Sequence, residues 1–304
     1  MDATTDESIR YLSGRAAFGS EDLVARTDDK RSPRVSVVTT VLNRVRTIER
    51  AVVSVLEQSY PSIEYVVMDG GSEDGTCEVL AKYSDVIDHI ESGVDSGIYD
   101  GMNRGIRRAT GEYIILLNSD DWYVPTCIET LMSAVLDRRL DAVSALAYEV
   151  DECGKNQRQL PRTELGYNVF LRMPLRHETM LVSRKVYDDI GLFDESYQII
   201  GDLKHTQRLF RRIEKQAYRF EQLNEPVMYF RKDGAASILT EKFIRERERL
   251  LKENFPDLRK GDLELLANEY QGDPEPYSAL ASSNESPPHL KKAIRAFLAM
   301  HGVN

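Results

Sequence analysis

The segment EYIILLNSDDW, residues 112–122, constrains the fold more than any other part of this chain. An apolar run of this length predicts a buried strand. The run gives way at once to Asn118, Ser119, Asp120 and Asp121. A buried strand that ends in two adjacent carboxylates needs a chemical reason for them.

Strand-like and helix-like segments alternate around this run, which predicts βαβ units and a largely parallel sheet. We predict strands at 34–41, 63–69, 86–92, 112–118, 141–150, 178–183 and 225–230. We predict helices at 46–60, around Val79 and Leu80, at 97–109, from Pro125 onward and at 201–213. The fold class is therefore α/β, with the sheet flanked by helices.

The chain of 304 residues suits one large α/β domain with an appendage, or two modest domains. Residues 1–33 form a polar N-terminal extension, 34–237 the main domain and 238–304 a helical C-terminal extension interrupted by a linker at 271–288. The final segment, HLKKAIRAFLAMHG, predicts a short amphipathic helix. It could dock on the main domain, on a second subunit of a homodimer, or peripherally on a membrane surface.

Charge and composition exclude several classes of protein. The formal net charge of −10 disfavours nucleic acid as a partner, although a local site can still bind a small anion. No stretch approaches the roughly 20 apolar residues that span a bilayer, and the start MDATTDESIR is too polar for a signal peptide. The three cysteines lack zinc-site spacing, and their odd number favours a reducing compartment. We expect a cytoplasmic protein, with at most peripheral contact at the inner face of the membrane.

Polar or acidic residues follow each of the first four predicted strands, with ESGVDSGIYDGMNRG after the third. In an open parallel sheet, the carboxyl ends of the strands share one edge, where ligands bind. Turns and helix caps alone can explain any one of these sites, but they explain the whole set poorly. The candidate binding residues at this edge are Thr39, Thr40, Asn43, Asp69, Gly71, Asn118 and Ser119.

Asp120 and Asp121 repel each other unless a positive charge lies nearby. Mg²⁺ and Mn²⁺ favour carboxylate oxygens, and Mg²⁺ commonly combines one or two carboxylates with substrate phosphates. The pair therefore predicts a metal-chelated diphosphate, with helix capping as the alternative role for Asp121. Neither GxxxxGK[ST] nor a GxGxxG after the first strand is present, so a nucleoside triphosphatase or a nicotinamide dehydrogenase has no motif support.

In order, these motifs resemble the family-2 glycosyltransferases with the Rossmann-like GT-A fold, over residues 34–237. The resemblance is closest to the branch that builds bacterial surface polysaccharides and glycolipids. It implies a nucleotide-binding half at 34–122 and an acceptor half at 123–237. It also implies an Mn²⁺ or Mg²⁺ cofactor, a nucleotide-diphospho-sugar donor such as a UDP-sugar, and a glycan or lipid-linked acceptor. The blocks that carry it are VSVVTTVLNR, SVLEQSYPSIEYVVMDGGSEDGT, DSGIYDGMNRGIRRATGEYIILLNSDDW, RHETMLVSRKVYDDIGLFDES and GDLKHTQRL.

The resemblance also assigns roles to residues of the donor site. Thr39 and Asp69 would hold the nucleotide, with Asp69 on the base. The segment Asn118–Asp120 replaces the family's metal-binding Asp-x-Asp motif, and Asp120 would be the metal ligand. Asn118 departs from the family because many members carry Asp there. The residues that would line the donor pocket near the ribose and diphosphate are Asp95, Asp100 and Asn103.

Asp202 matches the family's general base for an inverting transfer, in which a carboxylate takes the proton of the attacking hydroxyl. A carboxylate favoured by the helix dipole is the structural alternative for Asp202. The resemblance places His177 close to the active site and makes Arg176 a candidate for the diphosphate. Residues 230–237, FRKDGAAS, are a candidate loop over the donor site.

Two other functions stay open from the sequence. A nucleotidyltransferase that makes sugar nucleotides also uses a metal at the sheet edge, but TTVLNRVRTI lacks its usual glycine-rich basic loop. A catalytically silent sugar-nucleotide-binding subunit would explain Asn118 and the atypical DLKHTQRL.

Overall fold

The computed structural model describes residues 32–151, 175–232 and 240–268, together with short pieces between 154 and 173 and a few positions between 288 and 295. The strands are β1 (Val35–Val41), β2 (Ile63–Asp69), β3 (His89–Ser92), β4 (Tyr113–Asn118), β5 (Trp122–Tyr123), β6 (Ala142–Val150), β7 (Arg158–Gln159), β8 (Leu181–Ser183) and β9 (Phe220–Arg231). The α-helices are α2 (Ile48–Leu56), α3 (Thr76–Ala81), α4 (Ile98–Arg108), α5 (Cys127–Arg138), α6 (Arg184–Ile190), α7 (Gly201–Glu214), α8 (Glu241–Asn254) and α9 (Lys260–Asn268). Two 3₁₀ turns lie at Tyr167–Phe170 and His177–Thr179.

The strands form one mixed sheet in the order β3-β2-β1-β4-β8-β6-β9-β5, with β7 paired to β6. Strands β3, β2, β1 and β4 are parallel, as the sequence predicts. Strand β8 runs antiparallel to both β4 and β6, so the second half of the sheet is less parallel than expected. The central place of β4 explains why its apolar run is buried on both faces.

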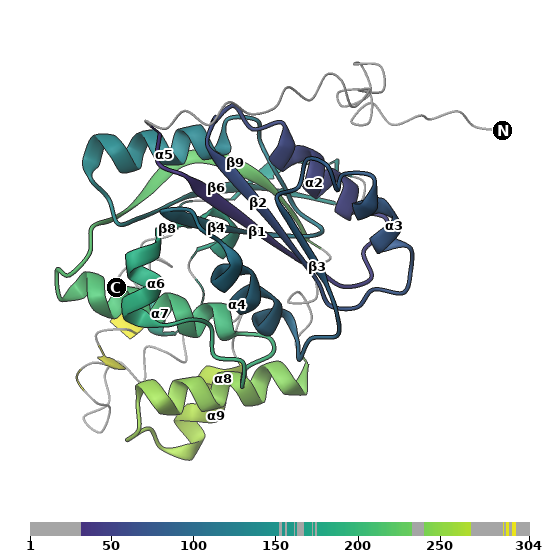
Figure 1. The fold of residues 1–304 in the computed structure, drawn as a ribbon. Helices are drawn as coiled ribbons and strands as arrows, with labels where there is room; N and C mark the ends of the chain where they lie inside the picture. The colour runs from purple at the N-terminus through teal and green to yellow at the C-terminus, as the bar shows by residue number, and fades with distance from the viewer. Residues whose placement is uncertain are drawn as a thin grey trace.

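Helices cover both faces of this sheet (Figure 1). Successive residues of a strand point to opposite faces, so Val37 packs toward α2 and α5 while Val38 packs toward α4. Helix α4 approaches β1 closely because Gly105 has no side chain. A Cβ atom at Gly105 would lie 2.3 Å from Val38 Cγ1. This close contact brings the N-terminal end of α4 to the edge where β1 and β2 end.

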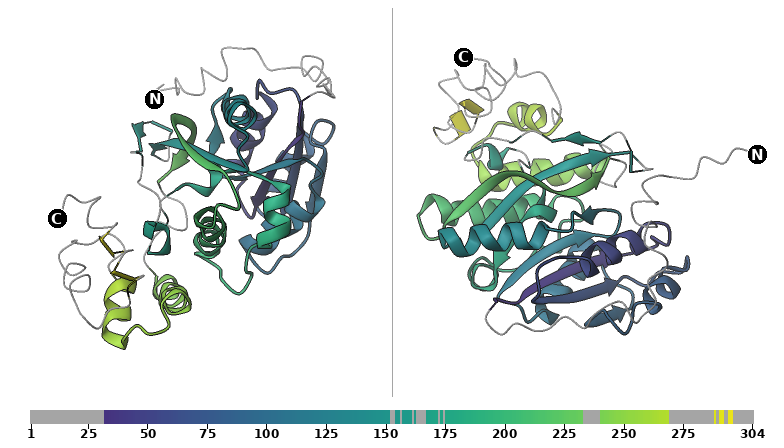
Figure 2. Two further views of the ribbon diagram at one scale, coloured as in Figure 1. Left: turned by 90° about the vertical axis from the view of Figure 1, so that its left-hand side faces the viewer. Right: turned by 90° about the horizontal axis from the view of Figure 1, so that it is seen from above.

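Helix α8 belongs to the same core as α7. Phe243, Leu250, Leu251 and Phe255 are buried in the cluster that also contains Leu203 and Leu209 of α7. Figures 1 and 2 show α8 and α9 as a further layer beneath α7, on the side of the sheet opposite α2 and α3. The segment predicted as a C-terminal extension therefore packs on the main domain through α8.

The sequence predicted the alternation of elements well but missed several local features. Helix α6 and the short strands β5 and β7 were not expected, and α5 begins at Cys127 rather than at Pro125. Residues 1–31, the linker at 271–287, Cys153 and positions 233–239 of the candidate loop lie outside the described residues. Within the part of the chain that the structure describes, none of the helices has the length and apolar character needed to span a bilayer.

Candidate active site

Asp69 ends β2 and organises the turn that follows it. Its carboxylate accepts hydrogen bonds from the amides of Gly71 and Ser72 at 3.1 Å and from the hydroxyls of Ser72 and Ser92 at 2.5 and 2.6 Å. Burial raises the pKa of Asp69, but the hydrogen bonds from Ser72 and Ser92 outweigh it and hold the pKa below its usual value. Asp69 is therefore an ionised carboxylate that fixes the turn after β2. To contact a nucleobase, it must lose its hydrogen bond from the hydroxyl of Ser72 or Ser92.

Asn43 joins the loops that follow β1 and β2. Its backbone lies in the left-handed region at φ 52°, and its amide donates to Ser72 Oγ at 2.7 Å. Its side-chain Oδ1 accepts from the Glu73 amide at 2.9 Å. Gly71 also has a positive φ, 91°, which lets the chain turn sharply beneath these contacts. The two loops are thus held in a fixed relation at the edge.

Asp95 inserts its carboxylate between the β2 turn and α4. A Cβ atom at Gly70 would lie 2.8 Å from Asp95 Oδ2, and one at Gly101 would lie 3.2 Å from the same oxygen and 3.1 Å from Thr40 Cγ2. Burial raises the pKa of Asp95. The hydrogen bond from the Gly97 amide lowers this pKa, and the negative charge of Asp100 raises it further. Asp100 accepts from the Ser96 amide at 3.0 Å. Thr40, Gly71, Asp95 and Asp100 therefore lie at the edge where β1 and β2 end.

Thr39 and Asn103 lie away from that edge. Thr39 is fully buried within β1, where Tyr65 Oη donates to its hydroxyl at 3.2 Å. Asn103 donates to Phe193 O and Glu195 Oε1 at 2.9 and 2.8 Å and accepts from the Phe193 amide at 2.9 Å. The polar atoms of both side chains face protein partners. These positions therefore favour structural roles over the contacts with a sugar-nucleotide donor that the sequence predicts.

The two carboxylates at the tip of β4 occupy different environments. Asp120 has 21% of its side chain exposed, and its Oδ2 lies 3.9 Å from Arg44 Nε. Burial raises the pKa of Asp120, and the charge of Arg44 offsets part of this rise. Asp121 is 2% exposed, and its Oδ1 accepts from the Arg231 amide at the end of β9 at 2.9 Å. Burial, followed by the charges of Glu178 and Asp120, raises the pKa of Asp121 well above its usual value. Asp120 is therefore the carboxylate that an incoming cation can reach.

A chain of contacts between polar side chains connects Asn118 to Asp202. Asn118 Nδ2 donates to Glu178 Oε1 at 2.6 Å. Glu178 Oε2 lies 3.4 Å from His177 Nδ1, which is 3.3 Å from Asp202 Oδ2. Tyr99 Oη, which also contacts Ile199 O at 2.8 Å, lies 3.1 Å from Asp202 Oδ1. Neither Glu178 nor Tyr99 is among the residues that the sequence predicts for the site, although Glu178 directly follows His177.

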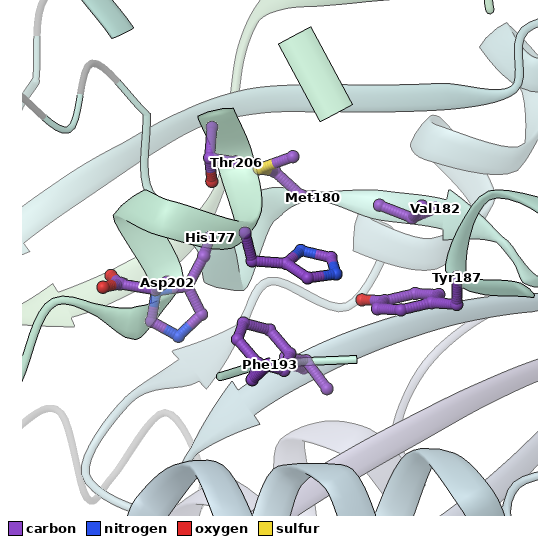
Figure 3. Close-up of a pocket in the computed structure, with 9 residues that line it drawn as sticks. His177, Met180, Val182, Tyr187, Phe193, Asp202 and Thr206 are labelled. Carbon is purple, nitrogen blue, oxygen red and sulfur yellow. The ribbon is translucent and has the colours of Figure 1, made fainter. Parts of the chain in front are cut away.

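His177 and Asp202 support each other electrostatically. Burial lowers the pKa of His177, but the charge of Glu178 and the hydrogen bond to Asp202 raise it above its usual value overall. Burial raises the pKa of Asp202, but the hydrogen bond from His177 and its charge lower it overall. Both residues border a small cavity of about 10 Å³, which Figure 3 shows with Asp202 and His177 toward one end and Tyr187 toward the other. His205 also lines this cavity, and burial lowers its pKa to about 4, so it is neutral where His177 is charged.

We predict that His177→Gln destabilises the fold in a pH-dependent way. The raised pKa of His177 stabilises the fold fully below 6.5 and less as pH rises through the folded-state pKa. The lowered pKa of Asp202 stabilises it above 3.8 and less as pH falls through the folded-state pKa. Urea unfolding should therefore show the largest penalty between about pH 4 and 6.5, roughly 1.5–3 kcal/mol for a charged hydrogen bond, and a smaller one in alkali. A penalty of constant size from acid to alkali would contradict the ion pair.

A divalent cation fits the tip of β4 only with help from a substrate. Among the described residues, no three His, Cys, Asp or Glu side chains are grouped so that they could hold a metal ion by themselves. Asn118 Oδ1, Asp121 Oδ2 and Glu178 Oε2 are buried without a hydrogen-bond partner in the described part of the chain, so acceptor oxygens gather there. A Mg²⁺ or Mn²⁺ ion that takes one carboxylate and completes its shell with phosphate oxygens suits Asp120.

Ser119 and Arg176 complete the set of predicted residues. Ser119 is buried at 7% exposure between Asn118 and Asp120. The Arg176 guanidinium lies over the Phe230 ring at 3.6 Å, next to the end of β9. Its positive charge opposes the rise in the pKa of Asp121, so Arg176 belongs electrostatically to the same edge.

The polar residues at the ends of β1, β2 and β4 and the chain of contacts from Asn118 to Asp202 form one continuous edge. Arg44, which follows Asn43, reaches Asp120, and Asp120 shares the tip of β4 with Asn118. Asn118 then leads through Glu178 and His177 to Asp202. A carboxylate edge beside a buried acid–base pair can hold an anionic ligand through a cation at one end and accept a proton at the other.

Comparison with profiles of known protein families shows which family contains this chain. The profile described as "Glycosyl transferase family 2" matches residues 36–214, more than half of the chain. The chain belongs to glycosyl transferase family 2. This match confirms the family and the transferase class that the sequence motifs predict. It extends from β1 to the end of α7 and includes every candidate site residue outside the candidate loop at 230–237.

Two relatives show how far the similarity extends. The uncharacterized glycosyltransferase RP339 of Rickettsia prowazekii is 31% identical over 194 residues, which cover 59% of each chain. The uncharacterized glycosyltransferase YibD of Escherichia coli K12 is 25% identical over 240 residues, covering 72% of this chain and 70% of YibD. The chain thus spans less than two thirds of the length of RP339.

Solved structures share the fold at low sequence identity. Residues 1–349 of Staphylococcus aureus TarS in complex with UDP-GlcNAc give a TM-score of 0.60 at 19% identity, covering 88% of this chain and 81% of that one. The mannosyltransferase PcManGT of Pyrobaculum calidifontis in complex with GDP-Man and Mn²⁺ gives 0.53 at 16% identity, covering 97% and 75%. These similarities confirm the GT-A type of α/β fold.

Proposed function

We propose that this protein is an inverting glycosyltransferase that moves a sugar from a nucleotide-diphospho-sugar, in the first instance a UDP-sugar, to a hydroxyl of a glycan or lipid-linked acceptor. The observation that carries the proposal is the continuous edge from Asp120 to Asp202. It combines a site for a chelated diphosphate with a buried carboxylate mounted on a helix. The acceptor class follows from the resemblance to the enzymes of surface polysaccharide and glycolipid synthesis.

Asp202 is the proposed general base. The acceptor oxygen bonds to the anomeric carbon, the bond from that carbon to the diphosphate oxygen breaks, and Asp202 takes the hydroxyl proton. Tyr99 and His177 contact its two oxygens and fix its orientation. A carboxylate of low pKa is a weak base toward a free alcohol. Proton transfer becomes favourable as the new bond forms and acidifies the attacking oxygen.

Asp120 is the proposed ligand of a Mg²⁺ or Mn²⁺ cofactor. When bound, such an ion would neutralise the charge that grows on the departing diphosphate. Arg44 beside Asp120 offers a second positive charge at the same place. Burial raises the pKa of Asp120 and so disfavours its charged form, and a cation bound beside it would offset this cost.

Asn43, Asp69 and Asp95 form the proposed nucleoside side of the donor site. Their loops are fixed by the Asn43–Ser72 and Asp69–Ser72 hydrogen bonds. A preorganised edge of this kind lowers the entropic cost of binding a nucleotide. The UDP-GlcNAc and GDP-Man complexes of the structural neighbours support a sugar nucleotide as the ligand class. UDP is our choice for the first test.

We predict that UDP together with Mn²⁺ raises the unfolding temperature more than UDP alone, GDP or Mn²⁺ alone. A ligand at about 100 times its Kd adds about 2.7 kcal/mol of stability, which corresponds to a shift of several degrees. A thermal-shift panel of nucleotides and sugar nucleotides, with and without metal, measures this. The absence of a shift with every nucleotide, in the presence of metal, would contradict the proposal.

Two alternative functions give different results in a turnover assay. A nucleotidyltransferase would release pyrophosphate from a nucleoside triphosphate and a sugar phosphate. A silent binding subunit would show the thermal shift without releasing UDP from a UDP-sugar. Slow hydrolysis of the UDP-sugar, lost in Asp202→Asn, supports the transferase over both.

A further inference from the structure

Glu246 of α8 binds the segment that leads into α7 and the proposed base. Its Oε1 accepts from the Gln198 amide at 2.8 Å, and its Oε2 accepts from the amides of Ile199 and Ile200 at 2.9 and 3.1 Å. Three consecutive backbone donors thus converge on one carboxylate that is 8% exposed. Helix α7 begins at Gly201, immediately after this segment.

Other α8 side chains hold the same segment from the outside. Glu253 accepts from Tyr197 Oη at 2.9 Å and pairs with Lys204 Nζ at 2.7 Å. Arg249 donates to Ser196 Oγ at 2.9 Å and lies over the Tyr197 ring at 4.4 Å. The contacts from α8 therefore extend from Ser196 to the first turn of α7.

Helix α4 holds the segment from the opposite side. Tyr99 Oη donates to Ile199 O and lies 3.1 Å from Asp202 Oδ1. A Cβ atom at Gly201 would lie 2.7 Å from the Tyr99 ring, so the ring packs directly on the helix start. At Ile199 the amide is bound to Glu246 of α8 and the carbonyl to Tyr99 of α4.

We propose that Glu246 is a positioning residue for Asp202: it fixes the backbone of residues 198–200 so that α7 presents the carboxylate to His177 and Tyr99. This inference rests on the proposed function. It makes α8, which lies beyond the region matched by the family profile, part of the catalytic unit. Glu246 contacts neither Asp202 nor the proposed donor site, so its effect passes through the backbone.

The role of Glu246 requires a carboxylate, because its three partners are all backbone N–H donors. In Glu246→Gln one oxygen becomes an NH₂ group that faces an amide N–H, so at least one contact turns repulsive. The start of α7 then shifts or loosens, and Asp202 loses its fixed place between His177 and Tyr99. Misplacement of a catalytic group by about 1 Å costs on the order of 100-fold in rate.

The test compares Glu246→Gln with Glu241→Gln, an exposed glutamate in the first turn of the same helix. UDP release from UDP-GlcNAc with Mn²⁺ gives kcat and KM, and hydrogen exchange reports the amides of 198–203. Glu246→Gln should lower kcat by about 100-fold, leave the donor KM near the wild-type value and speed exchange at 198–203 alone. Glu241→Gln should match the wild type in all three.

A folded Glu246→Gln protein with wild-type kcat would overturn the proposal, as would a loss that is accompanied by faster exchange throughout the chain. If this variant does not fold, Glu253→Ala decides, because it removes the outer contacts with Tyr197 and Lys204 on a more exposed side chain. It should lower kcat by about tenfold with an unchanged KM, and a wild-type kcat would overturn the proposal.

Failure of the proposed function gives a separate signature. In that case the wild type itself releases no UDP. The exchange measurement then decides alone: slow, wild-type exchange at 198–203 in Glu246→Gln rejects the positioning role, and fast exchange confined there supports it.

Discussion

Asp202→Asn is expected to lower kcat for UDP-sugar turnover by about 10²- to 10⁴-fold, the usual contribution of a general base. Asparagine has the same shape, and its amide can keep a contact with Tyr99. It cannot take a proton from the acceptor hydroxyl. Because Asp202 lies at the far end of the edge from Asp120, UDP affinity in the presence of Mn²⁺ should stay at the wild-type level.

The assay for this prediction is initial-rate kinetics together with UDP titration by calorimetry. Asp189→Asn is the matched control, because Asp189 lies on α6 and contacts Arg212 and Tyr218 rather than the site. An Asp202→Asn protein that turns over at the wild-type rate would remove Asp202 from the role of base. A loss of UDP affinity in that variant would instead place Asp202 in the donor site.

Asp120→Ala is expected to abolish the part of UDP binding that depends on metal and to lower turnover by about 10²- to 10³-fold. This is the cost of removing one electrostatic element from a site where charge develops. The Asp120 carboxylate is the reachable one at the tip of β4, whereas Asp121 is buried and bound to the Arg231 amide. The remaining affinity for UDP should equal that of the wild type without metal.

Titration of UDP with and without Mn²⁺, for the wild type and Asp120→Ala, measures this loss. Asp85→Ala is a suitable control. Asp85 is exposed and precedes the amino end of β3, whereas Asp120 lies at the carboxyl ends of the parallel strands. If Asp120→Ala still bound UDP more tightly with Mn²⁺ than without it, the metal ligand would have to be another residue.

The sequence was sufficient to predict the architecture around β4. The alternation of strand-like and helix-like segments predicted that β1, β2, β3 and β4 lie parallel, and their register confirms it. Because parallel strands end at one edge, the location of Asp69 and Asp120 followed from the predicted strand ends and the parallel arrangement. The motif resemblance added Asp202, which no strand-end argument reaches because it lies on α7.

Side-chain directions and distant partners could not be predicted. Adjacent residues of a strand face opposite sides of the sheet, so Thr39 is bound to Tyr65 inside the core while Thr40 lies next to Gly101 of α4. Glu178 and Glu246 have no special signal in the sequence. Their roles depend on partners about 50 residues or more away, Asn118 and the 198–200 segment, which only the folded chain brings close.

We propose that the edge formed by β1, β2 and β4 binds a sugar nucleotide through a cation held by Asp120. A crystal structure of the protein with UDP and Mn²⁺, with the manganese located by its anomalous signal, tests it most directly. We expect manganese on the Asp120 carboxylate and on the diphosphate, with the nucleoside beside Asn43 and Asp69. Manganese on other side chains, or UDP bound at another surface, would contradict it.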